Sequence, residues 1–385
     1  MINMIKGIRF AGIETGMKVK GLDVGLVVSD EDMNCLAVYT KNAVKAAHIL
    51  YNRRLKGNSI RAILVNSGCA NACTGEEGVE DLGNIARGLS ETLGIERQSI
   101  VFASTGVIGK RLPSDRIVAS IPMLLKGLDE NNIDVFARAI MTTDTYPKVI
   151  NTGFEGKRRY SVIGIAKGSG MINPLFATML VFIFTDFPVP IERFRRHFGT
   201  AVKGSFERIT VDGECSTNDT VMLFSKKSGS DEDSLGLFKE NLNKVMKELS
   251  LMVVRDGEGA TKVVHILVKG ARTRQDAEKI ARRIATSPLS KTAFFGCDPN
   301  WGRFMAAAGD AGVAINQSRV EIVLQDEVIV RDGIEVPFDE IRLKELMNRK
   351  EIELVIDLHH GRSFFDIYTT DLTYDYIKIN ASYRS

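Results

Sequence analysis

The chain has little of what marks several common classes of protein. Its five cysteines are an odd number without regular spacing, which argues against a disulfide framework and fits a reducing compartment. Its formal net charge of +3 is too mild, and too evenly spread, to indicate a nucleic-acid-binding surface. The longest apolar run, from Met179 to Phe184, is far shorter than the roughly 20 residues that span a bilayer. The first 16 residues hold no apolar core of signal-peptide length, so we expect a cytoplasmic protein.

Nucleotide and metal motifs are missing as well. Gly168-Ser-Gly170 lacks the third glycine of a dinucleotide fingerprint, and residues 256–262 lack the spacing of a phosphate loop. Cys69 and Cys73 have no histidine nearby, which argues against zinc. The adjacent histidines 359–360 would point to opposite faces of a strand, so they do not predict a shared metal either.

The apolar periodicity predicts a layered α/β (α+β) sandwich with mixed sheets. The content of 44% hydrophobic and 26% charged residues is typical of a globular protein. The tail from 351 to 379 alternates like two strands joined by a hairpin, and 186–190 (DFPVP) is the best linker candidate. Strands are further expected at 61–66, 99–104, 160–166, 178–184, 221–224 and 261–268, and helices at 79–93, twice within 112–141, and at 191–206, 234–251 and 272–285.

The most informative segment is 167–186, in which a glycine-rich turn reaches Ala177-Thr178 just before an apolar strand. A threonine hydroxyl is a poor nucleophile unless a base lies beside it. A cut directly before the threonine supplies that base as a new α-amine, with a reference pKa of roughly 7.7–8.0. The placement therefore suggests a self-processing enzyme with Thr178 as an N-terminal nucleophile. The plainer alternative is a β-branched residue that opens a buried strand.

Five other segments place small, hydroxyl or charged residues at the ends of predicted strands and helices. Each has a functional and a plainer interpretation, the latter being a tight connection, an ordinary turn, a helix end or a surface loop. At 66–75 the backbone can approach a ligand closely, and at 104–109 Thr105 and Gly106 can form an oxyanion hole. The segment 141–148 holds a cluster of hydroxyl groups, and 212–220 supplies the supporting carboxylates Asp212 and Asp219. At 256–262, Glu258 offers a carboxylate to a substrate amine.

Together these segments resemble the ornithine acetyltransferase family, also called bifunctional glutamate N-acetyltransferase. The resemblance covers nearly the whole chain. It implies the ornithine acetyltransferase fold, which is like that of N-terminal-nucleophile aminopeptidases. The matching motifs are NSGCANACTG (66–75), STGVIG (104–109), TTDT (142–145), KGSGMINPLFATML (167–180), DGECSTNDT (212–220), DGEGATK (256–262), FGCDPNWGR (295–303) and INASYRS (379–385).

The resemblance implies a role for each matching position. Self-cleavage between Ala177 and Thr178 would give an α chain of residues 1–177 and a β chain of residues 178–385. Thr178 would take the acetyl group, and Thr105 with Gly106 would form the oxyanion hole. Two chains of each kind would form a heterotetramer. The implied substrate-binding residues are Thr142, Lys167, Thr178, Glu258, Asn380 and Ser385.

The implied reaction moves acetyl from N2-acetylornithine to glutamate by a ping-pong route through an acetyl-threonine ester, as part of arginine biosynthesis. Lys167 would pair with a substrate carboxylate and Glu258 with the ornithine ammonium. Bifunctional members also use acetyl-CoA to acetylate glutamate. No metal or organic cofactor is required.

The chain departs from the family pattern at Cys69, where asparagine is expected, and at Leu175-Phe176, where Asn-Met is usual. Both departures bear on processing rate or donor choice. Two alternatives stay open. One is an amidase or aminopeptidase that uses the same nucleophile but passes the acyl group to water. The other is an uncleaved binding protein of the same fold.

Overall fold

The computed structural model describes residues 4–57, 59–173 and 179–382. Among these residues the chain forms two compact units. The first takes the described residues up to 207 together with 214–253, and the second takes 208–213 and 254–382. The linker expected at 186–190 is therefore wrong, because it connects a strand to a helix inside the first unit.

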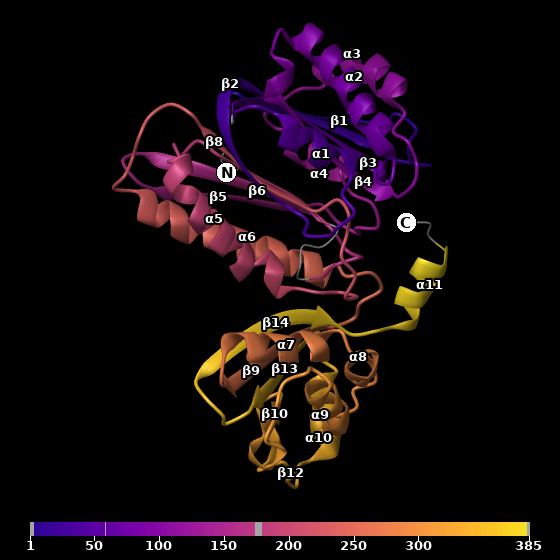
Figure 1. Ribbon diagram of the computed structural model, residues 1–385, viewed down its shortest axis with the longest axis vertical. Helices are drawn as coiled ribbons and strands as arrows, with labels where there is room; N and C mark the ends of the chain where they lie inside the picture. The colour runs from indigo at the N-terminus through magenta and orange to yellow at the C-terminus, as the bar shows by residue number, and fades with distance from the viewer. Residues whose placement is uncertain (1–3, 58, 174–178, 383–385) are drawn as a thin grey trace. The chain divides into compact units, whose positions relative to one another are not determined.

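An eight-stranded mixed sheet organises the described part of the first unit (Figure 1). Its strands follow the order β4-β3-β2-β8-β7-β6-β5, and β1 pairs with β2. The β3–β4 and β7–β8 pairs are parallel, so the carboxyl ends of β3 and β4 lie side by side. The bounds are β1 Ile8–Ile13, β2 Val24–Tyr39, β3 Ser59–Cys69, β4 Ile100–Val107, β5 Lys148–Glu155, β6 Arg159–Lys167, β7 Leu180–Thr185 and β8 Thr220–Lys226.

Helices cover both faces of this sheet, which explains why its strands read as continuous apolar runs. On β3, Ile63 packs into the core that contains Phe136 of α4, whereas its neighbour Leu64 packs into the core formed with α2 and α3. On β6, Gly164 admits α6, because a Cβ there would lie 2.7 Å from Leu249. The helices are α1 Ala47–Arg54, α2 Gly75–Leu93, α3 Ser114–Lys126, α4 Ile133–Ala139, α5 Ile191–Gly204 and α6 Leu235–Arg255, with 3₁₀ turns at Arg97–Ser99 and Phe206–Arg208.

A six-stranded mixed sheet in the order β12-β11-β10-β13-β9-β14 organises the described part of the second unit. Helix α7 packs against β9 and β14, and their apolar side chains share one core with α9 and α10. The strands are β9 Val263–Ala271, β10 Glu321–Leu324, β11 Glu327–Arg331, β12 Ile334–Glu335, β13 Glu351–Asp357 and β14 Ser363–Thr370. The helices are α7 Arg274–Ala285, α8 Pro288–Phe295, α9 Trp301–Gly309, α10 Glu340–Met347 and α11 Tyr374–Ser382, with a 3₁₀ turn at Gln317–Arg319.

The predicted class, a layered protein with mixed sheets, is confirmed. The hairpin predicted for the tail is wrong. β13 pairs in parallel with β9 and β14 pairs antiparallel with β9, so β9 lies between the two expected partners. The connection crosses the end of β9, where His360 N–H donates to the Gly270 carbonyl at 2.7 Å. The tail then ends in α11 rather than in a strand. Within the described ranges, no helix combines the length and apolarity needed to cross a membrane.

Candidate active site

Two glycines face each other near the carboxyl ends of the parallel strands β3 and β4. The register pairs Gly68 with Gly106, next to an irregularity at Cys69. Gly106 has a φ of +130°, and a Cβ there would lie 2.4 Å from the carbonyl carbon of Gly68. No other residue fits this approach, because both the backbone conformation and the space demand glycine. Thr105 precedes it with a side chain that is only 1% exposed.

Lys167 joins two of the predicted site residues. Its ammonium donates to Thr105 Oγ1 at 3.2 Å and to Thr142 Oγ1 at 2.9 Å. The lysine ends β6 and is 2% exposed, and Thr142 is half-buried, so the three side chains form a largely buried polar cluster. The structure thus brings together residues that are up to 62 positions apart in the sequence. A buried ammonium beside two hydroxyl groups suits the recognition of an anionic group.

Asp144 holds the backbone and the lysine next to this cluster in place. Its carboxylate accepts from Lys148 Nζ at 2.7 Å, from Gly168 N–H at 2.7 Å and from Thr142 N–H at 3.0 Å. Burial alone would raise the pKa of Asp144, but the charges of Lys167 and Lys148 and the hydrogen bonds outweigh it and lower the pKa to about 2. The carboxylate is therefore charged at neutral pH, and it fixes the backbone on both sides of the cluster.

The loop that precedes β8 ties the start of β7 to the rest of the site. Met179 N–H donates to Asp219 Oδ1 at 3.1 Å, and Thr220 N–H donates to the Met179 carbonyl at 3.1 Å. Asp219 is completely buried. Burial raises the pKa of Asp219 well above its usual range. The hydrogen bonds with the Met179 backbone and the Thr40 side chain, and the charge of Lys167, only partly oppose this.

Asn218 connects three of the sequence motifs through one amide group. Its Nδ2 donates to the carbonyls of Ala70 and Ser104, each at 2.7 Å. Ser104 directly precedes Thr105, and Ala70 directly follows β3, whose Gly68 faces Gly106. The buried amide therefore fixes the ends of β3 and β4 against the loop that carries Asp219.

The second unit holds the other described candidates. Asn380 of α11 donates to Glu258 Oε2 at 2.9 Å. The turn beneath them is tight, since a Cβ at Gly259 would lie 2.4 Å from the Tyr376 nitrogen. Asp212 also belongs to this unit, with the Tyr376 hydroxyl 3.4 Å from Oδ2. The two carboxylates that the sequence grouped in one motif, Asp212 and Asp219, thus belong to different units.

Three predicted positions, Ala177, Thr178 and Ser385, lie outside the described residues. Sequence reasoning gave no role to Asp144, Lys148 or Asn218, although each holds the site together. The sequence did offer a signal for the first two, because Asp144 and Lys148 have opposite charges and are four residues apart, a spacing at which side chains can pair. No local pattern pointed to Asn218, because its partners are 114 and 148 positions away.

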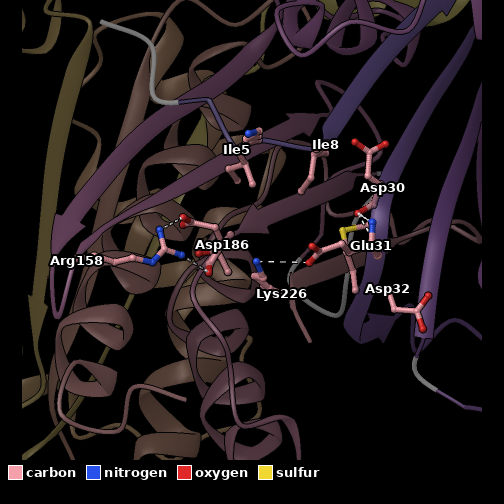
Figure 2. Close-up of a pocket in the computed structure, with 13 residues that line it drawn as sticks. Ile5, Ile8, Asp30, Glu31, Asp32, Arg158, Asp186 and Lys226 are labelled. Carbon is pink, nitrogen blue, oxygen red and sulfur yellow. Dashed lines mark hydrogen bonds and ion pairs between the residues drawn. The ribbon is translucent and has the colours of Figure 1, made fainter. Parts of the chain in front are cut away.

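A separate pocket of about 520 Å³ lies in the first unit and contains none of the predicted site residues (Figure 2). Its carboxylates already have cationic partners. Glu31 pairs with Lys226 at 3.5 Å and Asp186 with Arg158 at 2.7 Å, while Asp30 pairs with an arginine from β1. This pairing leaves little charge for recognising a substrate, so the pocket is not our candidate.

Comparison with known proteins identifies relatives over nearly the full length. The model of the ArgJ family matches residues 9–385. The arginine biosynthesis bifunctional protein ArgJ of Geobacter sulfurreducens is 44% identical over 391 residues, which cover 99% of this chain and 100% of that protein. The protein of the same name from Thermus thermophilus is 40% identical, with 100% of both chains covered. The crystal structure of ArgJ from Bacillus halodurans is 32% identical, covers 52% of this chain and 98% of that one, and has a TM-score of 0.49.

Proposed function

Because the chain belongs to the ArgJ family of bifunctional acetyltransferases of arginine biosynthesis, we propose that it moves acetyl from N2-acetylornithine to glutamate through Thr178. The family match confirms the resemblance that the sequence motifs indicated. The buried cluster of Lys167, Thr105 and Thr142 is the observation that carries the proposal, since it supplies a cation and hydroxyl groups directly beside the oxyanion turn.

In the first half-reaction, Thr178 Oγ attacks the acetyl carbonyl carbon. The Thr105 and Gly106 end of β4 stabilises the oxygen that becomes negative, and preorganised donors of this kind contribute on the order of 10²–10³ in rate. The C–N bond to ornithine breaks, the amine takes a proton and leaves, and an acetyl-threonine ester remains. Thr142 and Lys167 orient the substrate, with the lysine paired to its carboxylate.

Glu258 receives the side-chain ammonium of ornithine while N-acetylornithine is bound, and Asn380, which contacts Glu258, holds that carboxylate in place. In the second half-reaction, the glutamate amine attacks the ester and restores Thr178. Ser385 completes the substrate site. Acetyl-CoA is the second acetyl donor, and it enters through the same ester.

Self-cleavage between Ala177 and Thr178 generates the nucleophile's α-amine. The products are an α chain of residues 1–177 and a β chain of residues 178–385, which assemble as a cytoplasmic heterotetramer of two chains of each kind.

Denaturing mass spectrometry and a transfer assay test this function together. Freshly purified protein should split into two species with a free Thr178 amino terminus, and it should form N-acetylglutamate from N-acetylornithine and glutamate. Thr178→Ala should stay intact and inactive. Release of free acetate without N-acetylglutamate would identify a hydrolase instead, and an intact, inactive wild-type chain would refute the proposal.

A further inference from the structure

Lys18 brings a cation from the loop between β1 and β2 to the candidate active site. Its Nζ donates to the Met141 carbonyl at 3.0 Å. Its stem lies against the carboxyl end of β3, because a Cβ on Gly68 would lie 2.8 Å from Lys18 Cγ. Gly68 is the residue that faces Gly106, and Met141 directly precedes Thr142. Lys18 therefore contacts two of the segments that form the site, although no sequence motif pointed to it.

Asp23 fixes the loop that carries this lysine. Its carboxylate is 0% exposed and accepts from the backbone N–H groups of Thr15, Met17 and Lys18 and from the Thr15 hydroxyl, at 2.7–3.3 Å. With four donors from its own loop, the carboxylate has its hydrogen bonds without the Lys18 ammonium. The loop thus holds the lysine by its backbone, and the ammonium lies at the Met141 carbonyl instead.

The Lys18 ammonium can bind a further anion. An ammonium has three donors, and the Met141 carbonyl is the only acceptor that the described residues give it. The side chain is half-buried, and burial lowers the pKa of Lys18, which the charges of Asp23, Asp144 and Glu14 partly oppose. The two buried carboxylates among these, Asp23 and Asp144, already accept several hydrogen bonds from other groups. The remaining lysine donors therefore suit an incoming carboxylate.

The two amino acids of the proposed reaction differ in the charge of their side chains. Both carry an α-carboxylate, but ornithine ends in an ammonium and glutamate in a second carboxylate, which needs a second cation. Within the described part of the chain, three lysines donate hydrogen bonds to residues 141–144, namely Lys18, Lys148 and Lys167. Lys148 is 0% exposed and pairs with Asp144, and Lys167 is assigned to the α-carboxylate. Lys18 is left for the second carboxylate.

We propose that Lys18 binds the γ-carboxylate of glutamate in the second half-reaction, an inference that rests on the proposed function. Glutamate places its α-carboxylate at Lys167, whose ammonium contacts Thr142, and its γ-carboxylate at Lys18, whose ammonium contacts the preceding residue. Two cations held by adjacent residues suit a small dicarboxylate. Ornithine has no second carboxylate and does not use Lys18. The lysine is thus a residue that determines specificity for the acetyl acceptor.

Steady-state kinetics of the full-length, self-cleaved enzyme test this role. In a ping-pong reaction, kcat/KM for each substrate depends only on the half-reaction in which that substrate takes part. Lys18→Met keeps the stem against Gly68 and removes the charge. It should lower kcat/KM for glutamate about 10–100-fold and leave kcat/KM for N-acetylornithine unchanged. In the reverse direction, kcat/KM for N-acetylglutamate as donor should fall by a similar factor, because it carries the same carboxylate.

Two more variants separate substrate binding from support of the fold. Lys18→Arg keeps a cation and should lose much less glutamate activity than Lys18→Met. Lys20→Met is the matched control, because Lys20 is exposed in the same loop, and it should change neither half-reaction. An unchanged kcat/KM for glutamate in Lys18→Met would overturn the proposal. So would an equal loss in both half-reactions, or an equal loss in Lys18→Arg. A wild-type enzyme without transfer activity would instead refute the proposed function.

Discussion

The buried ion pair between Asp144 and Lys148 allows a quantitative prediction. Both side chains are 0% exposed, their charged atoms are 2.7 Å apart, and the carboxylate also accepts the Gly168 N–H. Asp144→Asn removes the carboxylate that faces the Lys148 ammonium in this buried pair. Removing one partner of a buried pair costs about 3–5 kcal/mol, so the free energy of unfolding should fall by that amount. The melting temperature should drop by roughly 6–20 °C, at about 2–4 °C per kcal/mol for a unit of this size.

The pH dependence follows from the direction of the shift. The pKa of Asp144 is lowered to about 2 in the folded protein, against 3.8 ordinarily. The resulting stabilisation, about 2–3 kcal/mol, is therefore present above pH 4 and is lost as the pH falls through the folded pKa. The difference between wild type and Asp144→Asn should stay constant from pH 7 to 5 and shrink by about 1 kcal/mol by pH 3.

Urea unfolding, followed by far-ultraviolet circular dichroism at each pH, measures both effects. Adding Lys148→Met to Asp144→Asn should recover part of the loss, because both charges of the buried pair are then removed together. Glu76→Gln is the control, since Glu76 pairs with Arg54 on the surface, and this change should leave the urea midpoint nearly unchanged. A loss below 1 kcal/mol for Asp144→Asn, or one that is the same at pH 3 and pH 7, would refute this reasoning.

Three substitutions and one measurement on the wild-type protein test other parts of the proposal. Gly106→Ala should lower kcat in the transfer assay by at least about 100-fold, because its Cβ would lie 2.4 Å from Gly68 and displace the proposed oxyanion hole. A normal kcat would exclude that role. Asn218→Ala should lower the unfolding free energy in urea by about 2–6 kcal/mol, because two buried carbonyls lose their donor. Glu258→Gln should raise the KM for N-acetylornithine about 10–100-fold with little change in thermal stability, and an unchanged KM would remove Glu258 from the substrate site. The two cleaved chains should elute together in gel filtration and separate only in denaturant; separation in native buffer would contradict the sheet order.

Local sequence patterns were sufficient for most of the first unit. Helix α2 was predicted because Leu82, Ile85 and Leu89 repeat at helical spacing, and these side chains are buried in the structure. Strand β3 was predicted from its apolar run, which is buried on both faces. The hairpin predicted for the tail was wrong because an alternating pattern indicates a strand but does not specify which strand it pairs with. The residues of β13 and β14 give no indication that β9 lies between them.

The candidate site was predicted unevenly for the same reason. Resemblance indicated Thr105, Thr142 and Lys167 individually, but only the fold shows that one ammonium contacts both hydroxyl groups. Asn218 escaped notice because an amide that satisfies distant carbonyls leaves no local periodic pattern. Residues that contact substrate can be read from motifs, whereas residues that hold those motifs together depend on tertiary contacts.

The sheet order also explains how the fold can tolerate the proposed cut. β7 begins two residues after Thr178, and its six residues are all buried. It pairs with β6, which the α chain would supply, and with β8, which the β chain would supply. Both chains therefore contribute neighbouring strands to one core, and cleavage breaks a covalent bond at the end of a strand without breaking a backbone ladder. The start of β7 is also tied to the loop before β8, because the Met179 N–H donates to Asp219 Oδ1 and the Met179 carbonyl accepts from the Thr220 N–H. These contacts do not depend on the bond between Ala177 and Thr178, so the strand should keep its place after the proposed cut.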